Sequence, residues 1–474
     1  MLLTYLLGER FFGRRAGWLA AVVFGTSVKI AWQARFGQID MLLTALVAAA
    51  VWFWVRGYTE GRARLYPLFF LFAGLATLAK GPVGLLPPLL SIVAYLLLVR
   101  EWGELRRVRI GLGLLIWAAV VVAWLVPAGL DGGAEYLRNI VLKQNVTRYA
   151  DPWHHFQAPW YYLTIIPVDF FPWAVLLPTA VVVGWRWLRA AGPADEASGL
   201  ARKGYLFALC WTVVTLVFFS LSPAKRTVYI LTMYPAMALL VGAALDRLAA
   251  DWRAAGAAGP PGAERRWLTW PLGLFAAVAL LLPPAVVVVG RRQAEYLAAA
   301  GTGFVPIVAF ALSLLAAGAV VAFLLALRGR VIAGAGSLAG GTAAMFLAGV
   351  LLAAPRFDAL KSARPLSEML VERMAPGEPY AIYPHLDAPF LFYTERFAVP
   401  LDGEAELQEF TRRPGRKWLL IERDDLARLE RPLPLVEVAR DRDPRDGYLL
   451  MTDPPPPAPR REGTGGNRPE GARR

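Results

Sequence analysis

Long apolar runs are the feature that most constrains how this chain can fold. A helix of about 20 apolar residues is long enough to cross the hydrocarbon core of a membrane. Hydrophobic residues form 57% of the sequence and charged residues only 18%, which excludes a soluble globular protein of this size. The predicted fold class is therefore a polytopic α-helical membrane protein. About eleven crossings are predicted, at residues 16–34, 40–55, 66–79, 82–99, 110–128, 161–185, 204–220, 227–245, 268–289, 304–327 and 331–353.

Lys and Arg are unequally divided between the two sets of loops that join these runs. One set contains 20 of them and the alternating set contains 10. Because basic loops remain in the cytoplasm, the richer set is predicted to be cytoplasmic, which places residues 129–160 and the chain after residue 354 outside. The predicted location is the cytoplasmic membrane. The net charge of +14 is then explained by topology, and no nucleic-acid partner is predicted. The richer loops are 9–15, 56–64, 100–109, 186–203, 246–266 and 328–330.

The end of the chain has a different composition from the apolar part. Residues 1–354 form the predicted transmembrane domain, and residues 454–474, rich in Pro, Gly and Arg, are predicted to be disordered. Between them, 355–453 is predicted to be a small extracytoplasmic α/β domain. Its expected helices are 361–375 and 403–412, and its expected strands are 379–383, 390–393, 417–421 and 448–451.

A polar and aromatic segment at 129–173 interrupts the apolar runs and is predicted to be a loop. Asn145, Arg148, His154 and His155 precede the aromatic residues at 160–162, which are typical of the membrane interface. Polar groups at that level lie where a lipid headgroup would lie. They are candidates for binding a substrate, although each of Arg148, His154 and His155 could equally be a solvated loop residue.

Five further polar residues lie at the outer ends of predicted crossings: Asp40, Lys80, Lys225, Arg226 and Tyr229. Ionisable groups at such depth are costly, so they are candidate site residues. Asp40 could instead cap the helix that follows it, and Lys80 could extend to the interface at a tight turn. Lys225 and Arg226 have no carboxylate nearby in the sequence, and a phosphate would satisfy both cations.

Other kinds of site find little support in the sequence. There is no Gly-rich phosphate loop and no spaced His/Cys cluster, so no cofactor is predicted with certainty and a divalent metal is unsupported. Cys210 is the single cysteine, which excludes an intrachain disulfide, and it is interpreted as a helix-packing residue. The sequon at Asn145 is a weak pattern, and Asn145 is interpreted as a site residue instead.

Four motifs occur in a characteristic order: RFGQIDMLL at 35–43, LAKGPVGL at 78–85, QNVTRY at 144–149 with the following HH and PWYYL, and FFSLSPAK at 218–225 with YIL at 229–231. Together they resemble the polyprenyl-phosphate-dependent glycosyltransferases. They are most similar to the bacterial branch that contains the aminoarabinose transferases of lipid A and relatives of the protein O-mannosyltransferases.

The resemblance implies a membrane-embedded GT-C fold and an inverting sugar transfer. The donor would be a polyprenyl-phosphate-linked sugar, and the acceptor an envelope lipid, glycan or protein. Lys80, Arg148, Lys225 and Tyr229 would hold the phosphate, and Asp40 would play a supporting catalytic role. The chain departs from the family at Lys225-Arg226-Thr227-Val228-Tyr229, where the family usually has Lys-Leu-Pro-x-Tyr.

The start of the chain bears on this hypothesis. Residues 1–7 are apolar over too short a stretch to span a membrane, so they are expected to be the end of a helix that begins upstream. Members of the family carry their catalytic carboxylate in a loop after the first helix, and the main base is therefore also expected upstream. The alternative hypothesis is a non-catalytic membrane protein that binds or transports a lipid phosphate. It is less favoured because the candidate residues gather on one face and no inverted repeat is found.

Overall fold

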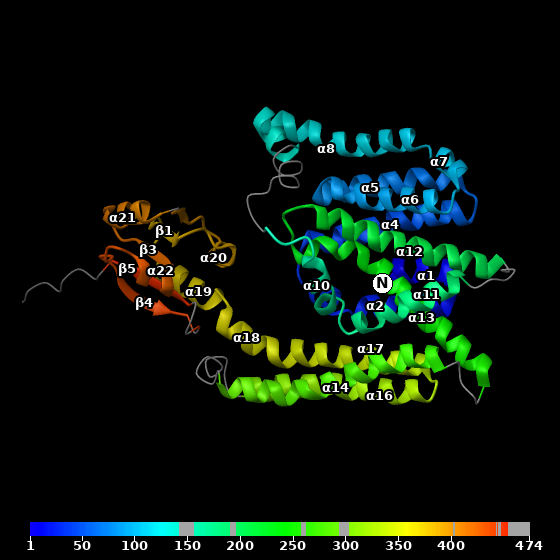
Figure 1. The fold of residues 1–474 in the computed structure, drawn as a ribbon. Helices are drawn as coiled ribbons and strands as arrows, with labels where there is room; N and C mark the ends of the chain where they lie inside the picture. Colours follow the sequence, from blue (N-terminus) through cyan, green and yellow to red (C-terminus); the bar gives the residue numbers. More distant parts are fainter. Residues whose placement is uncertain are drawn as a thin grey trace, which may run out of the picture. The chain divides into compact units, whose positions relative to one another are not determined.

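The computed structural model describes residues 1–141, 156–189, 196–256, 262–292, 303–401, 403–441, 443 and 447–453. Within them the chain forms two compact units. The first unit comprises Met1–Ala285 and Ala309–Ala348, and the second comprises Val286–Val308 and Gly349–Arg474. The first is helical, and the second contains a five-stranded sheet (Figure 1).

The helices of the first unit surround α13, whose side chains are buried on every face along most of its length. Small residues allow this packing: a Cβ added at Gly242 of α13 would lie 2.7 Å from the backbone nitrogen of Ala20 in α2. The α-helices up to the Ala348 boundary are α1 (Leu2–Phe12), α2 (Arg14–Thr26), α3 (Val28–Gln33), α4 (Ile39–Thr59), α5 (Tyr66–Lys80), α6 (Leu86–Leu98), α7 (Trp102–Val108), α8 (Ile110–Arg138), α10 (Tyr161–Asp169), α11 (Leu177–Arg189), α12 (Glu196–Leu221), α13 (Tyr234–Ala255), α14 (Gly262–Arg292), α16 (Phe304–Leu327) and α17 (Val331–Ala348). The short 3-10 helices are η1 (Ala63–Leu65), η2 (Pro82–Gly84), η4 (Trp173–Leu176) and η5 (Thr227–Met233).

The outer helices expose apolar side chains, as expected of a protein surrounded by lipid. On α8, Leu115 is 68% exposed and Val126 is 53% exposed, whereas the side chains of α13 face other helices. Such an apolar surface is unfavourable in contact with water but not in contact with lipid tails. Helix α16 packs against both α14 and α17, where Gly273 of α14 lies beside Phe323 and Gly318 of α16 lies beside Gly341 (Figure 1). The chain is therefore a multi-pass membrane protein.

Eight helices of the described part are long and apolar enough to cross a membrane, or nine if the pair Tyr161–Asp169 and Trp173–Arg189, bent by 112°, is one broken span. The expected run at 16–34 is not a single helix. It breaks at Ser27, whose backbone is extended between α2 and α3. The apolar helix at Pro82–Leu98 is shorter than the others. The total of about eleven crossings stays a prediction.

The prediction that residues 129–141 belong to a loop was wrong. Helix α8 continues to Arg138, with a kink at Gly133, where φ is 75°. The sequence after the kink, Ala-Glu-Tyr-Leu-Arg, consists mainly of good helix formers, so local propensity supports the extension. Gly133 permits the change of direction because it lacks a Cβ.

The sheet of the second unit has the strand order β2-β1-β3-β5-β4. Strand β1 is parallel to β2 and β3, and β5 is antiparallel to β3 and β4. Alternate residues of β3 supply two cores, with Trp418 and Leu420 on one face and Leu419 and Ile421 on the other. The strands are β1 (Tyr380–Tyr383), β2 (Val399–Pro400), β3 (Trp418–Glu422), β4 (Val436–Arg440) and β5 (Tyr448–Thr452). The helical segments are η7 (Gly349–Ala353), α18 (Ala354–Lys361), α19 (Arg364–Arg373), α20 (Ala388–Thr394), α21 (Glu404–Arg412) and α22 (Arg423–Arg428).

One expected strand of this unit, at 390–393, is instead part of helix α20. Pro389 lies in the first turn of α20, a position that suits proline. Phe390 and Thr394, four residues apart, are both buried, whereas Phe392 is 75% exposed. This spacing is that of a helix with one buried face. Strands β2 and β4 were not predicted, and residues 454–474 lie outside the described part of the chain.

Candidate functional site

Asp40 and Lys80 form an ion pair between two neighbouring helices. Asp40 lies in the first turn of α4, and Lys80 is the last residue of α5. The Lys80 ammonium donates a hydrogen bond to the Asp40 carboxylate, whose side chain is only 8% exposed. The alternative that Asp40 merely caps its helix is wrong, because Gln38 occupies the cap position and no side chain caps the helix by a hydrogen bond. A buried carboxylate of this kind needs its cation.

Tyr229 completes this group from a distant part of the sequence. Its ring lies beneath the Lys80 ammonium, with 5.1 Å between the nitrogen and the ring centroid, which is a cation–π distance. The ring also packs against Phe219 of α12, with centroids 5.7 Å apart. Helix η5, which carries Tyr229, packs against both α4 and α12. The structure therefore brings Asp40, Lys80 and Tyr229 together, at the Asp40 end of α4.

Lys225 is buried, and it is not the unpaired cation that its sequence context suggested. Its side-chain ammonium donates to the carbonyl oxygens of Ser222, at 2.6 Å, and Gln157, at 3.0 Å. The backbone closes the same contact, since the Gln157 amide donates to the Pro223 carbonyl at 3.1 Å. Burial lowers the pKa of Lys225. Lys225 thus joins the turn before η5 to the segment before α10.

Arg226, directly after Lys225, is exposed. Its carbonyl accepts hydrogen bonds from the Tyr162 hydroxyl, at 3.4 Å, and the Tyr229 amide, at 3.1 Å. No side-chain partner of its guanidinium occurs among the described residues. The two adjacent cations therefore differ: Lys225 is held by the backbone, and the Arg226 guanidinium is accessible to a ligand.

Sequence reasoning missed a second polar group near η5. Lys29 of α3 donates to the Thr227 hydroxyl at 2.7 Å and lies 3.7 Å from the carboxylate of Asp169. Asp169, at the end of α10, is 8% exposed. In the sequence, Lys29 is one of the 10 basic residues of the alternating loops, and Asp169 lies within the predicted crossing at 161–185. A carboxylate within the aromatic stretch at 160–173 was the available signal, because such groups are rare in apolar segments.

Four of the predicted binding residues, Asn145, Arg148, His154 and His155, lie outside the described residues. Their roles stay predictions. Over the ranges that the structure describes, no three His, Cys, Asp or Glu side chains gather as a metal site would require.

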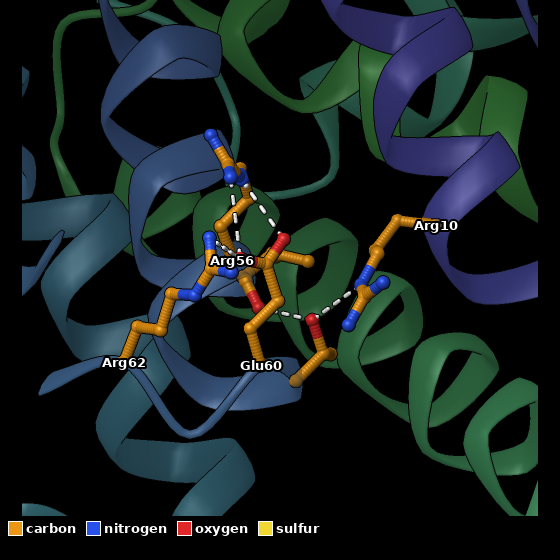
Figure 2. Close-up of polar contacts among 6 residues, drawn as sticks. Arg10, Arg56, Glu60 and Arg62 are labelled. Atoms are coloured by element: carbon orange, nitrogen blue, oxygen red, sulfur yellow. Dashed lines mark hydrogen bonds and ion pairs between the residues drawn. The ribbon is translucent and has the colours of Figure 1, made fainter.

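The opposite end of α4, the Glu60 end, carries a different set of charges. The guanidinium groups of Arg56 and Arg62 both contact the Glu60 carboxylate (Figure 2). The nitrogen–oxygen distance is 2.9 Å in each pair. Arg10 donates to the hydroxyl of the adjacent Thr59 at 2.6 Å. The hydrogen bonds from Arg56 hold the pKa of Glu60 below its ordinary value. Arginines outnumber carboxylates here, as expected of a basic loop beside a membrane.

Parts of this chain are similar to known proteins. The family model described as dolichyl-phosphate-mannose-protein mannosyltransferase matches residues 1–126. An undecaprenyl phosphate-alpha-4-amino-4-deoxy-L-arabinose arabinosyl transferase of Erwinia tasmaniensis is 30% identical over 247 residues, which are 51% of this chain and 42% of that protein. A Pseudomonas fluorescens protein of the same name is 32% identical over 249 residues, 51% of this chain and 41% of that protein. The matched part is thus less than half the length of these relatives.

Solved structures extend the likeness to most of the chain. ArnT from Cupriavidus metallidurans bound to undecaprenyl phosphate superimposes with a TM-score of 0.75 and 23% identity, over 95% of this chain and 81% of that one. The apo state of the same protein gives a TM-score of 0.73 at 22% identity, over 95% and 80% of the two chains. At these identities the structures show the fold. The chain has the GT-C fold of ArnT, and about half of its sequence is similar to aminoarabinose transferases that use undecaprenyl phosphate.

Proposed function

We propose that this chain transfers a sugar from a polyprenyl-phosphate donor to an envelope acceptor, a lipid, glycan or protein, with inversion at the anomeric carbon. The observation that carries the proposal is the group formed by Asp40, Lys80 and Tyr229, beside the turn held by Lys225. The fold supports it, because a solved protein of this fold is bound to undecaprenyl phosphate. The names of the similar sequences support an arabinosyl-type transfer.

The chemistry of such a transfer explains why cations are needed. The acceptor hydroxyl oxygen bonds to the anomeric carbon while the bond from that carbon to the phosphate oxygen breaks. The electron pair leaves with the polyprenyl phosphate, and the hydroxyl proton passes to a base. Negative charge therefore grows on the phosphate, and positioned cations in a site with little water stabilise it.

The described residues would divide this work. Lys80 is held by Asp40 and by the ring of Tyr229, so its ammonium has a defined position before a ligand binds. Lys225 orients the turn that leads to Arg226 and Tyr229, and the accessible Arg226 guanidinium can pair with phosphate oxygens. Asp40 is engaged by Lys80, which fits a supporting role. Asn145, Arg148, His154 and His155, which lie outside the described residues, are proposed to bind the donor as well.

The Asp40 end of α4 is proposed to face the outside of the cytoplasmic membrane, together with the sheet of the second unit. The distribution of Lys and Arg between the loops supports this orientation. Nucleotide sugars are cytoplasmic, so a site on the outer face requires a donor anchored in the bilayer.

Cysteine labelling tests the orientation. In a Cys210→Ala background, Leu130→Cys and Phe397→Cys place thiols at positions that are 84% and 98% exposed. A membrane-impermeant maleimide should label both in intact cells. It should label the control Gly103→Cys, in an expected cytoplasmic loop, only after the cells are opened. Labelling of Gly103→Cys in intact cells, with the other two protected, would reverse the orientation.

Donor binding and transfer test the function. Purified protein in nanodiscs should bind undecaprenyl phosphate, and Lys80→Gln should weaken binding by about ten- to a hundredfold, the effect of losing one charge-assisted contact. Lys203→Gln is the matched control. Lys203 lies away from the site and forms an ion pair with Glu101, with 2.7 Å between nitrogen and oxygen. Equal binding by wild type and Lys80→Gln would contradict the site. Binding with no transfer to any lipid, glycan or protein acceptor would favour the alternative, a protein that only binds lipid phosphate.

A further inference from the structure

A charged cavity lies at the Glu60 end of α4, where η1 and the first turn of α5 meet α7 and α8. Its volume is about 410 Å³, which is far more than one water molecule needs. Three arginines line it, Arg64, Arg107 and Arg109. Tyr66 and Phe70 of α5 and Leu112 of α8 form much of the remaining wall.

The cavity has an excess of positive charge. Arg107 donates to Glu104 at 3.1 Å, and the same carboxylate accepts a hydrogen bond from the Tyr66 hydroxyl. This contact holds the Arg107 guanidinium in place and balances one charge. Arg64 and Arg109 form no ion pair within the ranges that the structure describes. Three guanidinium groups around one space suit an anion with several oxygens, because each presents a planar fork of N–H donors.

The other part of the wall is apolar and continues into the membrane. Phe70 is buried against Gly113 of α8, where a side chain would collide with its ring. Leu112 and Leu115, in the first two turns of α8, are exposed on a helix that is long and apolar enough to cross the membrane. An occupant with an anionic head at the arginines could therefore extend an alkyl chain along α8. A free phosphate ion would use only the basic part.

We propose that this cavity binds the phosphodiester headgroup of an anionic phospholipid, with the acyl chains lying along α8. The site is distinct from the Asp40 end. Arg64 precedes α5, and Lys80 ends it, so the two groups are separated by a helix of 15 residues, or about 22 Å. The proposal does not depend on sugar transfer, since none of its residues belongs to the proposed donor site.

Native mass spectrometry of the full chain, released from nanodiscs that contain equal amounts of phosphatidylglycerol and phosphatidylcholine, tests the proposal. Wild type should retain phosphatidylglycerol preferentially. The triple variant Arg64→Gln/Arg107→Gln/Arg109→Gln should retain about one tenth as much phosphatidylglycerol, or less. A reduction of this size is expected when at least one charge-assisted contact is lost. The control Arg186→Gln/Arg189→Gln removes two arginines in the last turn of α11, away from the cavity, and should leave retention unchanged.

A single variant guards against loss of folding. Arg109 has a left-handed backbone with φ of 49°, a conformation that asparagine adopts readily. Arg109→Asn therefore removes one cation without straining the chain, and it should reduce phosphatidylglycerol retention with an unchanged melting temperature.

Three outcomes would overturn the proposal. The first is equal retention of phosphatidylglycerol by wild type, Arg109→Asn and the triple variant. The second is equal retention of phosphatidylcholine and phosphatidylglycerol by wild type, which would show that charge does not select the lipid. The third is displacement of the lipid by inorganic phosphate at equal concentration, which would identify a phosphate site with no contribution from the acyl chains.

Discussion

The two ends of helix α4 handle charge in different ways. At the Asp40 end, each described lysine has a specific partner: Lys80 meets Asp40, Lys225 meets two carbonyl oxygens, and Lys29 meets Thr227 and Asp169. At the Glu60 end, three arginines gather near a single glutamate (Figure 2), and further arginines line a cavity nearby.

Burial accounts for the difference. Asp40 and Lys225 are 6% and 3% exposed, so their charges must be compensated by the protein or by a ligand. Arg56 and Arg62 share one carboxylate and are 32% and 51% exposed, so water or lipid headgroups can compensate the remaining charge. A buried, partnered lysine is therefore the stronger indication of a site, and an exposed arginine excess indicates topology or a lipid surface. Four predictions test this contrast.

The largest effect is expected for Lys80→Met. The change leaves the buried Asp40 carboxylate without its cation, which should lower the free energy of unfolding by about 3–5 kcal/mol. Unfolding of the detergent-solubilised protein by a denaturing detergent measures it. The double variant Asp40→Asn/Lys80→Met removes both charges and should recover most of the stability but none of the donor binding. Recovery of donor binding in the double variant would show that the pair serves stability alone.

A smaller effect, on donor affinity, is expected for Lys225→Met. This change removes the hydrogen bonds from Lys225 to the carbonyl oxygens of Ser222 and Gln157. Hydrogen bonds to a charged group contribute about 1.5–3 kcal/mol, so donor affinity should fall by about ten- to a hundredfold if that turn orients the site. Equilibrium binding of undecaprenyl phosphate measures it. Lys203→Met, which breaks an exposed pair, is the control. Unchanged affinity in a folded Lys225→Met would assign Lys225 to the scaffold.

Lys29→Met should have an intermediate effect on stability. The change leaves the buried Asp169 carboxylate without the Lys29 cation and the Thr227 hydroxyl without its hydrogen-bond donor. The free energy of unfolding should fall by about 1–2 kcal/mol. Adding Asp169→Asn should reduce that cost, because the uncompensated carboxylate is then absent. The same unfolding assay applies. A larger cost in the double variant than in Lys29→Met would show that Asp169 has a different partner.

The smallest effect is expected at the Glu60 end. Glu60→Gln should lower the free energy of unfolding by about 0.5–1 kcal/mol at neutral pH, as the loss of ion pairs near the protein surface does. Because the pKa of Glu60 is lowered in the folded protein, its contribution is present above the ordinary glutamate pKa and disappears as pH falls through the lowered value. Melting temperatures of wild type and Glu60→Gln between pH 7 and pH 3, about the range in which the carboxylate titrates, should therefore converge at low pH. A constant difference would exclude the ion pairs as its cause.

The candidate site shows how far local patterns can be taken. Polar residues at the ends of apolar runs indicated Asp40, Lys80, Lys225 and Tyr229 as candidates, because isolated charges in such positions are costly. The same patterns could not show that Lys225 is held by backbone carbonyls. That contact depends on a pairing between the segment before α10 and the turn before η5, more than 60 residues apart in the sequence.

In the fold, too, some features follow from local sequence patterns and others depend on tertiary packing. Hydrophobic content and run length determined by themselves that the chain is a helical membrane protein, since an apolar run of about 20 residues has the length of a membrane-spanning helix, which satisfies its own backbone in lipid. They also indicated a smaller α/β unit near the end. Whether 390–393 is helix or strand was decided by tertiary packing, because a short apolar segment fits either structure until its buried face is chosen. Only the folded chain brings Asp40, Lys80 and Tyr229 together, because their helices are distant in sequence and meet through side chains that no local pattern pairs.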